Sequence, residues 1–398
     1  MLGLYIHIPF CRSRCAYCDF FSTTREAETE RYVQALCCEI ESRREELPHA
    51  RVCTIYIGGG TPSLLSPTLL RRILDTVYTH YEVDPEAEVT MEMNPDDWPL
   101  SNSPRGGEDS ITSEGKNENI GLAALPPTGG AGRGAINRIS LGIQTFDDNL
   151  LRLIRRRHDS ATAIQAVRRL QDAGITNISI DLIYGLPGQS LEQWEHDLDI
   201  AFSLGIQHLS AYALSYEPGT VLTRWRDEGR FTEVPEELSV TMYERLCQRA
   251  HEAGFEHYEI SNFALPGYHS RHNSSYWTGA PYLGFGPGAH GYDGLRTRRA
   301  NKPSLDEYLR CCGQCFQLET LTTTALYNEA VMCALRTARG IDLTSLANRF
   351  GQSRLDDLLH MAAPHLRAGR LILDADHLRL AENALMVSDD IISDLISL

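Results

Sequence analysis

The sequence has 398 residues, of which 42% are hydrophobic and 23% charged, enough for one large core and a smaller appended unit. Its formal net charge of −16 argues against nucleic acid as the main partner, because phosphate binding needs a positive field. No apolar run reaches the roughly 20 residues of a membrane-spanning helix, and the N-terminus lacks a leader pattern. We therefore expect a cytoplasmic protein whose 11 cysteines stay reduced.

The first two thirds of the chain alternate short β-rich segments with amphipathic helical segments. Six strands alternating with helices indicate parallel β/α units, hence an α/β fold. These units could close as a barrel, form part of one, or lie as an open doubly wound sheet. The predicted strands are 4–8, 53–58, 89–93, 138–143, 178–185 and 208–214, and the predicted helices are 32–40, 67–78, 161–173, 191–204 and 236–253.

The segment 99–136 interrupts this alternation. It holds eight Gly and four Pro in 38 residues, so it cannot bury enough apolar surface to offset the cost of ordering its backbone. We expect a mobile surface insertion there, although a long loop of this kind can also serve as a lid.

The last part of the chain, 325–398, has a different pattern. It predicts a helix ending at Gly340, helices over 343–350 and 355–368, a hairpin turning at 375–376 and a last helix over 389–396. Together these indicate a helical, winged-helix-like unit. From 341 to 398 there are five Arg, no Lys and nine Asp or Glu, which favours a structural or partner-docking role over DNA binding.

Three cysteines follow the first predicted strand in the segment FCRSRCAYCDFFS. Cys11, Cys15 and Cys18 have C-x3-C-x2-C spacing, and thiolates are soft ligands suited to zinc or iron–sulfur clusters. Structural zinc usually takes four protein ligands, whereas a [4Fe–4S] cluster held by three cysteines leaves one iron open. With Tyr17 before the last cysteine, the motif strongly resembles the radical S-adenosylmethionine (SAM) superfamily, in which the fourth iron binds the amino and carboxylate groups of SAM.

Motifs at the ends of the later strands extend this resemblance. GGGTPS follows the second strand, and its glycines allow a close backbone approach to a ligand. A carboxylate such as Glu92 can accept hydrogen bonds from an ammonium or a ribose hydroxyl, and Asp181 needs a partner within its apolar run. The motifs most closely resemble the branch containing oxygen-independent coproporphyrinogen III oxidase, which implies a partial (β/α)6 TIM-like barrel over 1–222. By this resemblance the SAM pocket is lined by Tyr5, Tyr17, Gly59, Gly60, Thr61, Glu92, Gln144, Arg156, Asp181 and Ala213.

Two features separate the chain from the oxidases of this branch. The oxidases carry a further cysteine two residues after the third cluster cysteine, where this chain has Phe20. The stretch HNSSYW, with the Gly-rich turn after it and the small C-terminal domain, resembles the HemW-type haem chaperones. Imidazole is a haem axial ligand, so the resemblance implies His272 as a haem ligand, with His269 and His290 as alternatives. His290 could instead face the SAM site.

These resemblances imply a radical-SAM-type protein that carries haem as cargo and delivers it to a haem-accepting protein. Membrane-associated respiratory enzymes are candidate acceptors, and they would bring the chain to the membrane periphery. The alternative is a coproporphyrinogen III oxidase that uses a 5′-deoxyadenosyl radical, an activity that Phe20 disfavours. A third reading, tRNA modification, is disfavoured by the charge. The implied parts are the cluster- and SAM-binding barrel over 1–222, a connecting region over 223–324 and the C-terminal domain over 325–398.

The remaining cysteines carry weaker signals. Cys311, Cys312 and Cys315 form a CCGQC group, which we interpret as a helix-surface or redox-sensitive group, with metal binding as the less favoured reading. The others are expected to be small packing residues: Cys37, Cys38, Cys53, Cys247 and Cys333.

Overall fold

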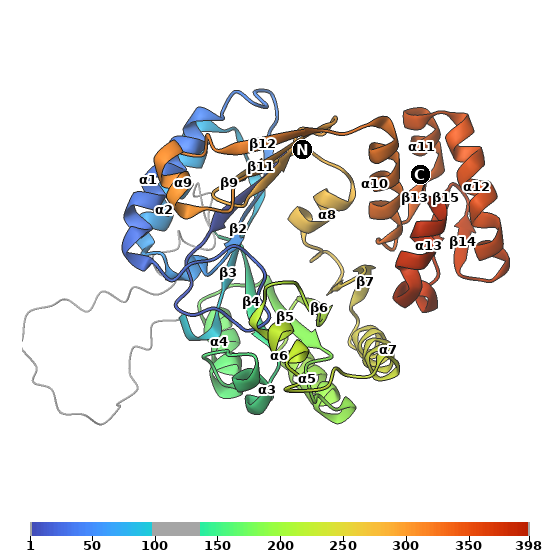
Figure 1. Cartoon of the computed structure of the whole chain (residues 1–398), viewed down its shortest axis with the longest axis horizontal. Coiled ribbons are helices and arrows are strands. Elements are labelled where there is room, and N and C mark those ends of the chain that lie inside the picture. The colour runs from blue at the N-terminus through green and yellow to red at the C-terminus, as the bar shows by residue number, and fades with distance from the viewer. Residues whose placement is uncertain (1, 98–135, 397–398) are drawn as a thin grey trace, which may run out of the picture.

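The computed structural model describes residues 2–97 and 136–396 (Figure 1). Of the predicted insertion over 99–136, only Ile136 falls within the described residues, and its side chain is fully buried. None of the described helices is both long enough and apolar enough to cross a membrane.

A single twelve-stranded sheet forms the centre of the molecule. Six neighbouring strands are parallel and follow one another in chain order: β1 (Leu2–Ile8), β2 (Val52–Gly59), β3 (Val83–Met93), β4 (Arg138–Gln144), β5 (Ile178–Tyr184) and β6 (His208–Ala213). A doubly wound sheet reverses its strand order part-way along, so this order rules that alternative out. The two ends of the sheet are not hydrogen-bonded to each other, and the fold is a partial barrel.

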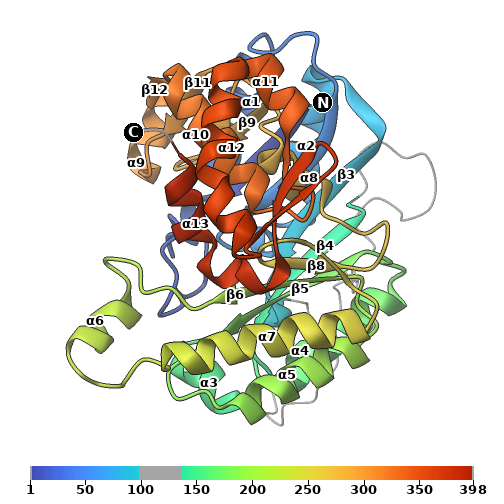
Figure 2. The ribbon, with the colours of Figure 1, turned by 90° about the vertical axis from the view of Figure 1, so that its right-hand side faces the viewer.

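Helices between these strands cover the outside of the sheet (Figures 1 and 2). Their starts are encoded locally: Asp159 caps one helix, and Ser190 with Gln193 forms a capping box at another. All five predicted helices are confirmed with end shifts of a few residues, and two short helices, α3 and α6, were not predicted. The helices are α1 (Thr29–Ser42), α2 (Pro67–His80), α3 (Asp148–Leu153), α4 (Ser160–Asp172), α5 (Leu191–Ser203), α6 (Val221–Asp227) and α7 (Glu236–Glu252).

Strands from the second half of the chain extend the sheet at both edges. On one side, β9 (Tyr282–Phe285) pairs in parallel with β1, and β10 (His290–Tyr292), β11 (Thr297–Asn301) and β12 (Phe316–Thr320) follow antiparallel. On the other side, β8 (Asn262–Ala264) and β7 (Glu256–Glu259) continue antiparallel from β6. These edge strands were not predicted, because each spans only three to five residues, too short for a periodic pattern.

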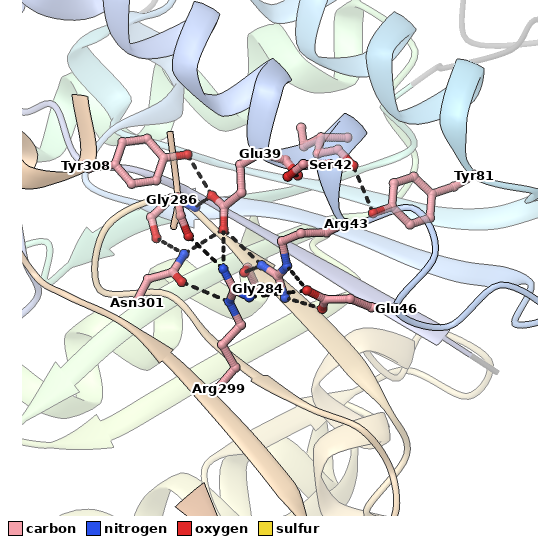
Figure 3. A network of polar contacts seen from close by, with 12 residues as sticks. Glu39, Ser42, Arg43, Glu46, Tyr81, Gly284, Gly286, Arg299, Asn301 and Tyr308 are labelled. Atoms are coloured by element: carbon pink, nitrogen blue, oxygen red, sulfur yellow. Dashed lines mark hydrogen bonds and ion pairs between the residues drawn. The ribbon is translucent and has the colours of Figure 1, made fainter. Parts of the chain in front are cut away.

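A buried polar network fastens α1 to the β9–β11 extension and to α9 (Leu305–Cys311) (Figure 3). The fully buried carboxylate of Glu39 accepts hydrogen bonds from the Arg43 guanidinium at 2.9 Å and the Tyr308 hydroxyl at 2.7 Å. It also accepts from the Asn301 amide at 2.8 Å and the Gly286 backbone amide at 2.9 Å. Buried charges are tolerated when they are paired and hydrogen-bonded in this way, so the network fixes where the second half of the chain joins the barrel.

The C-terminal unit has its own core, around Tyr327, Leu335, Leu358 and Leu378. The predicted helices and hairpin are present, and a short strand completes a three-stranded sheet. The unit is tied to β7 through a β-bridge between Glu259 and Thr337 and two backbone hydrogen bonds of 3.0 Å each. Its elements are α10 (Thr323–Leu335), β13 (Ile341–Asp342), α11 (Leu343–Phe350), α12 (Gln352–Arg367), β14 (Leu371–Asp374), β15 (His377–Leu380), the 3-10 helix η5 (Glu382–Val387) and α13 (Ser388–Leu395).

Candidate functional site

The three-cysteine loop leaves the sheet at the carboxyl end of β1, where parallel β/α folds place their sites. Cys11, Cys15 and Cys18 are half-buried free thiols. The Arg156 guanidinium donates to the Cys15 sulfur at 3.3 Å, and the Thr61 hydroxyl lies 3.8 Å from the Cys11 sulfur. Burial raises the pKa of the Cys11 thiol and raises that of Cys18 to about 11, so both need a metal to become thiolates.

The spread of these sulfur atoms distinguishes a cluster site from a single-ion site. Among the described residues, the three do not belong to any set of His, Cys, Asp or Glu ligand atoms that lie within 4.8 Å of one another. They therefore do not converge on one ion, whereas separated thiolates suit a polynuclear cluster. The donor set fits the group that the sequence motif implies.

The glycine loop after β2 forms one wall beside the cysteines. Gly59 adopts a positive φ of 110°, which favours glycine, and a Cβ there would clash with the His7 ring. A Cβ on Gly60 would lie 2.7 Å from the backbone oxygens of Ile8 and Phe10. Thr61, buried, accepts from the Asn94 amide at 2.9 Å. Three of the predicted SAM-contacting residues thus form a tightly packed backbone edge that admits no larger side chains.

Glu92 lies beside this edge, near the end of β3. Its two carboxylate oxygens accept from the Tyr56 hydroxyl at 2.8 Å and the Gly59 backbone amide at 2.9 Å. Burial, together with the nearby Asp181, raises its pKa to about 7, although both hydrogen bonds oppose the shift. Because its pKa is near 7, a cationic ligand such as an ammonium group would stabilise the ionised form of this carboxylate.

Arg156 connects the cysteine loop with the end of β4. Besides Cys15, it donates to the Asn94 side chain at 2.6 Å and to the Gly142 backbone oxygen. Gln144, at the end of β4, has a φ of 75°, a left-handed conformation that is rare for residues other than glycine and is typical of functional sites. Its side chain packs against Gly142, where a Cβ would lie 2.9 Å from its amide nitrogen.

The other predicted SAM-pocket residues occupy neighbouring strands and loops. Asp181 accepts from the Ser140 hydroxyl at 3.2 Å, and burial raises its pKa. The Tyr5 hydroxyl hydrogen-bonds the Nδ1 atom of His7 at 3.0 Å. Tyr17 packs against the small apolar cluster around Ile154, and Ala213 is exposed at the end of β6. The predicted SAM-pocket residues therefore lie on the parallel strands and in the loops after them, with Tyr5 and Asp181 in the middle of β1 and β5.

Helix α8 (Arg271–Trp277) carries the HNSSYW stretch and lies between β2 and the C-terminal unit (Figure 1). Ser270 caps it, and buried Glu88 accepts from the backbone amides of Arg271 and His272 at 2.9 Å each. A carboxylate at a helix N-terminus satisfies its free amide groups. The sequence reasoning missed Glu88, which has no motif of its own.

His272 points inward from α8 and is fully buried. Its Nδ1 atom is hydrogen-bonded to the Thr54 hydroxyl at 2.8 Å and its Nε2 atom to the Tyr276 hydroxyl at 2.8 Å. The ring stacks on Tyr56 with a centroid separation of 5.0 Å, and burial lowers its pKa to about 3. Both nitrogens are occupied, so this geometry gives His272 no free ligand atom and argues against the predicted haem ligation.

A cavity of about 990 Å³ opens where the cysteine loop, α8, β10 and the C-terminal unit meet. Phe20 and Phe21 line it from the cysteine loop, Tyr276 and Trp277 from α8, and His290 from β10. Phe20, the residue at the position of the oxidases' extra cysteine, is 62% exposed. The cavity was not predicted, because its walls come from segments far apart in the sequence.

The two other candidate histidines also line this cavity. The Nε2 atom of His269 lies 2.8 Å from the Glu256 carboxylate. No hydrogen bond to the exposed His290 ring is made by any residue that the structure describes. Among the described contacts, His290 is therefore the candidate with both ring nitrogens available, whereas His269 keeps only its Nδ1 atom, and His290 lines the cavity.

The partial barrel and its three-cysteine loop define a protein of the radical SAM class. The model of the Radical SAM superfamily matches residues 129–201, and that of the HemN C-terminal domain matches residues 321–387. "Heme chaperone HemW" of Bacillus subtilis (strain 168) is 34% identical over 382 residues, covering 94% of this chain and 94% of that protein. The chain belongs to the HemW family.

One further relative by sequence and one solved structure are also similar to this chain. "Radical S-adenosyl methionine domain-containing protein 1, mitochondrial" of Danio rerio is 31% identical over 405 aligned positions, covering 98% of this chain and 86% of that protein. The solved structure of coproporphyrinogen III oxidase (HemN) from Escherichia coli, described as a radical SAM enzyme, superposes with a TM-score of 0.80 at 21% identity. It covers 100% of this chain and 90% of that chain, and it confirms the fold.

Proposed function

We propose that the protein is a haem chaperone, which binds haem in the 990 Å³ cavity and passes it to a haem-accepting protein. The observation that supports this most directly is the position of the cavity, which adjoins the cysteine loop, carries the aromatic residues of α8 and is bordered by the C-terminal unit. Its volume lies at the upper end of the usual range for ligand pockets, about 300–1,000 Å³, as a macrocycle requires.

The lining has the chemistry that haem needs. Phe20, Tyr276 and Trp277 offer apolar ring faces to a porphyrin, and His290 offers the imidazole. The Arg298 and Arg349 side chains also line the cavity, and guanidinium groups bind carboxylates such as the haem propionates. Arg298 is paired with Glu329 at 2.8 Å, so a propionate would compete with this carboxylate.

In this proposal His290 ligates the haem iron and His272 positions the cavity wall. His272 holds the Tyr276 hydroxyl, and Tyr276 lines the cavity. Replacing His272 would then loosen the wall without removing the iron ligand. His272 as the direct ligand is the alternative, and it requires the bond to Tyr276 to break.

We further propose that Cys11, Cys15 and Cys18 hold a [4Fe–4S] cluster whose open iron takes SAM. When bound, these groups supply one-electron reducing chemistry. The chain's own contribution is positional: the Gly59–Thr61 edge and Glu92 would orient the methionine end of SAM. Arg156, in contact with Cys15, would stabilise negative charge at the thiolates. The division of the chain at about 222 and 324 into barrel, connection and C-terminal domain is part of this proposal.

The cavity also supports carrying haem over oxidising its precursor. An exposed phenylalanine, Phe20, stands on the cavity side of the cluster loop where the resembling oxidases have an additional cysteine. Its ring adds apolar surface for a bound macrocycle and cannot ligate or transfer a proton. Coproporphyrinogen III oxidation is the second candidate function, favoured only by the shared fold.

The test begins with anaerobically reconstituted protein. One sample is titrated with haem and followed by its absorption spectrum, and another receives coproporphyrinogen III, SAM and reductant. We expect stoichiometric haem binding and no protoporphyrinogen. Steady porphyrinogen turnover would refute the chaperone function.

The ligand is tested in the same titration. His290→Ala should change the absorption spectrum of bound haem. His272→Ala should weaken haem binding but leave the spectrum of the bound haem unchanged. The matched control is His269→Ala, which removes another histidine of the cavity lining and should leave the spectrum unchanged. The reverse pattern for His290 and His272 would make His272 the ligand.

A further inference from the structure

A second group of potential metal ligands lies outside the proposed cluster and haem sites, where α7 and β7 meet the C-terminal unit. Cys247 is on α7, His257 is on β7 and Glu382 begins η5. Figure 2 shows α7 lying beneath the C-terminal unit. One ligand atom from each side chain lies within 4.8 Å of the other two. Among the described residues, this is the only set of three such groups that converges in this way.

The separation of the first two ligand atoms suits a single ion. The Cys247 sulfur lies 3.9 Å from the Nδ1 atom of His257. Tetrahedral zinc with bonds of about 2.3 Å to sulfur and 2.0 Å to nitrogen would place these atoms about 3.5 Å apart. The required contraction is a few tenths of an ångström. Glu382 is exposed, so its side chain can rotate to bring an oxygen to the same point.

The His257 ring is already oriented for ligation. Its Nε2 atom donates to the backbone oxygen of Ile260 at 3.4 Å, which leaves the lone pair on Nδ1, facing Cys247. The ring stacks on Phe263 with a centroid separation of 4.1 Å and an interplanar angle of 15°. Metal-binding histidines commonly donate their second nitrogen to a backbone carbonyl in this way, which fixes both the tautomer and the ring plane.

The geometry argues against the other chemistry that a Cys–His–Glu group can support, nucleophilic catalysis. A nucleophilic cysteine needs a base that a third group orients through its second nitrogen. Here the second nitrogen of His257 is directed to the backbone oxygen of Ile260, so Glu382 does not orient the imidazole through that nitrogen.

We propose that Cys247, His257 and Glu382 form a zinc site between the C-terminal unit and the barrel, an open site in which water is the fourth ligand, unlike structural zinc sites with four protein ligands. Sulfur, imidazole and carboxylate together match the preferences of Zn²⁺. Binding replaces the thiol proton, which is released to solvent, with a sulfur–zinc bond. There is no change of oxidation state.

The site has a direct structural consequence for the cavity. Tyr258 and Glu259 follow His257 on β7 and line the cavity. The same strand is bridged to Thr337 of the C-terminal unit. Zinc at this position would hold β7 and η5 together, and would therefore hold the cavity wall that β7 contributes.

The experiment measures zinc and iron per chain by elemental analysis. Cluster-loaded protein is equilibrated with zinc alone at a low free concentration set by a chelator, and an otherwise identical chain with Cys11, Cys15 and Cys18 all replaced by Ser is treated in parallel. We expect about one zinc per chain in both, and a melting temperature that rises with zinc. The Glu382→Gln and Cys247→Ser variants should bind zinc at least tenfold more weakly and lose that rise. The matched control is Cys53→Ser, which removes a half-buried thiol from β2 and should bind zinc like the parent.

The outcomes separate the proposal from its alternatives. Equal zinc content in the parent and in Glu382→Gln would overturn the site, and since Glu382 is exposed, this variant is expected to fold normally. Zinc lost only with Cys11, Cys15 and Cys18 would assign the metal to the cluster loop and also overturn it. Cobalt in place of zinc should give a sulfur-to-cobalt absorption band in the parent, and persistence of that band in Cys247→Ser would count against the proposal.

Discussion

Replacing Glu92 with Gln tests how the SAM side of the site is held. The folded-state pKa of Glu92 is raised from 4.5 to about 7, mainly by burial. A raised carboxyl pKa means that the folded state binds the proton more tightly than the unfolded state does. Its contribution to stability is therefore present below pH 4.5 and is lost as the pH rises through 7. Integrated to pH 8.5, the ionised Glu92 costs the wild type about 3 kcal/mol.

Glutamine at this position carries no charge, so the free-energy cost of a buried ionised carboxylate is absent from the variant. Its amide keeps one acceptor for the Tyr56 hydroxyl or the Gly59 amide and loses the other, at about 1 kcal/mol. We expect Glu92→Gln to be more stable than the wild type by about 2 kcal/mol at pH 8.5, and about equally stable near pH 5. With an unfolding entropy of about 2.1 cal/mol/K per residue, the gain at pH 8.5 corresponds to about 2 °C in Tm.

The assay is thermal unfolding without SAM, at several pH values, for both proteins. Glu86→Gln, an exposed change in the same strand, is the control and should show no pH-dependent difference. The stabilised variant should bind SAM at least tenfold more weakly, because in the proposed site the carboxylate would face the ammonium group of SAM, and the variant has no such charge. A Tm difference that is independent of pH, or that favours the wild type at pH 8.5, would refute the buried-carboxylate argument.

Two further predictions concern the fold and the cavity. Glu39→Ala should lower the free energy of unfolding by about 3–5 kcal/mol in chemical denaturation, because the buried Arg43 and three other donors lose their acceptor. Glu46→Ala removes a partner of Arg43 that is 37% exposed and that water can replace, so it should cost about 1 kcal/mol; equal losses would contradict the network. Phe20→Ala should weaken haem binding about tenfold by removing an apolar face, with the iron content per chain unchanged. Unchanged haem affinity would place the cargo elsewhere.

Local features of the sequence determined the parallel core. Large aliphatic residues recur at every second position along β1, β4 and β5, which is the period-2 pattern of a strand. The capping residues before α4 and α5 mark the starts of those helices. The cysteine spacing and the GGGTP stretch could be interpreted without any structure, because the residues that form each of them are adjacent in the chain.

The cavity proposed to bind haem, and the state of its candidate ligands, could not be predicted from local sequence patterns, because both depend on contacts between distant segments. His272 looked like a ligand because imidazole binds iron, but Thr54 and Tyr276 occupy both of its nitrogens. His290 and Phe20 are 270 residues apart in the sequence, and only the extension of the sheet by β9 and β10 brings them to one cavity. Cys247 was predicted to be a small packing residue; it does pack against the core, but the fold also places it beside His257 and Glu382.

The sequence alone thus determined the α/β class, the family with the partial barrel that it implies, and the loop that would hold a cluster. These depend on periodicity and on short motifs, which are properties of neighbouring residues. The tertiary structure decided how short strands extend the sheet at both edges, where the C-terminal unit sits, which histidine has both nitrogens free and where a second metal could bind. Those properties arise where segments far apart in the chain are packed together, and packing also determines which polar atoms remain unpaired.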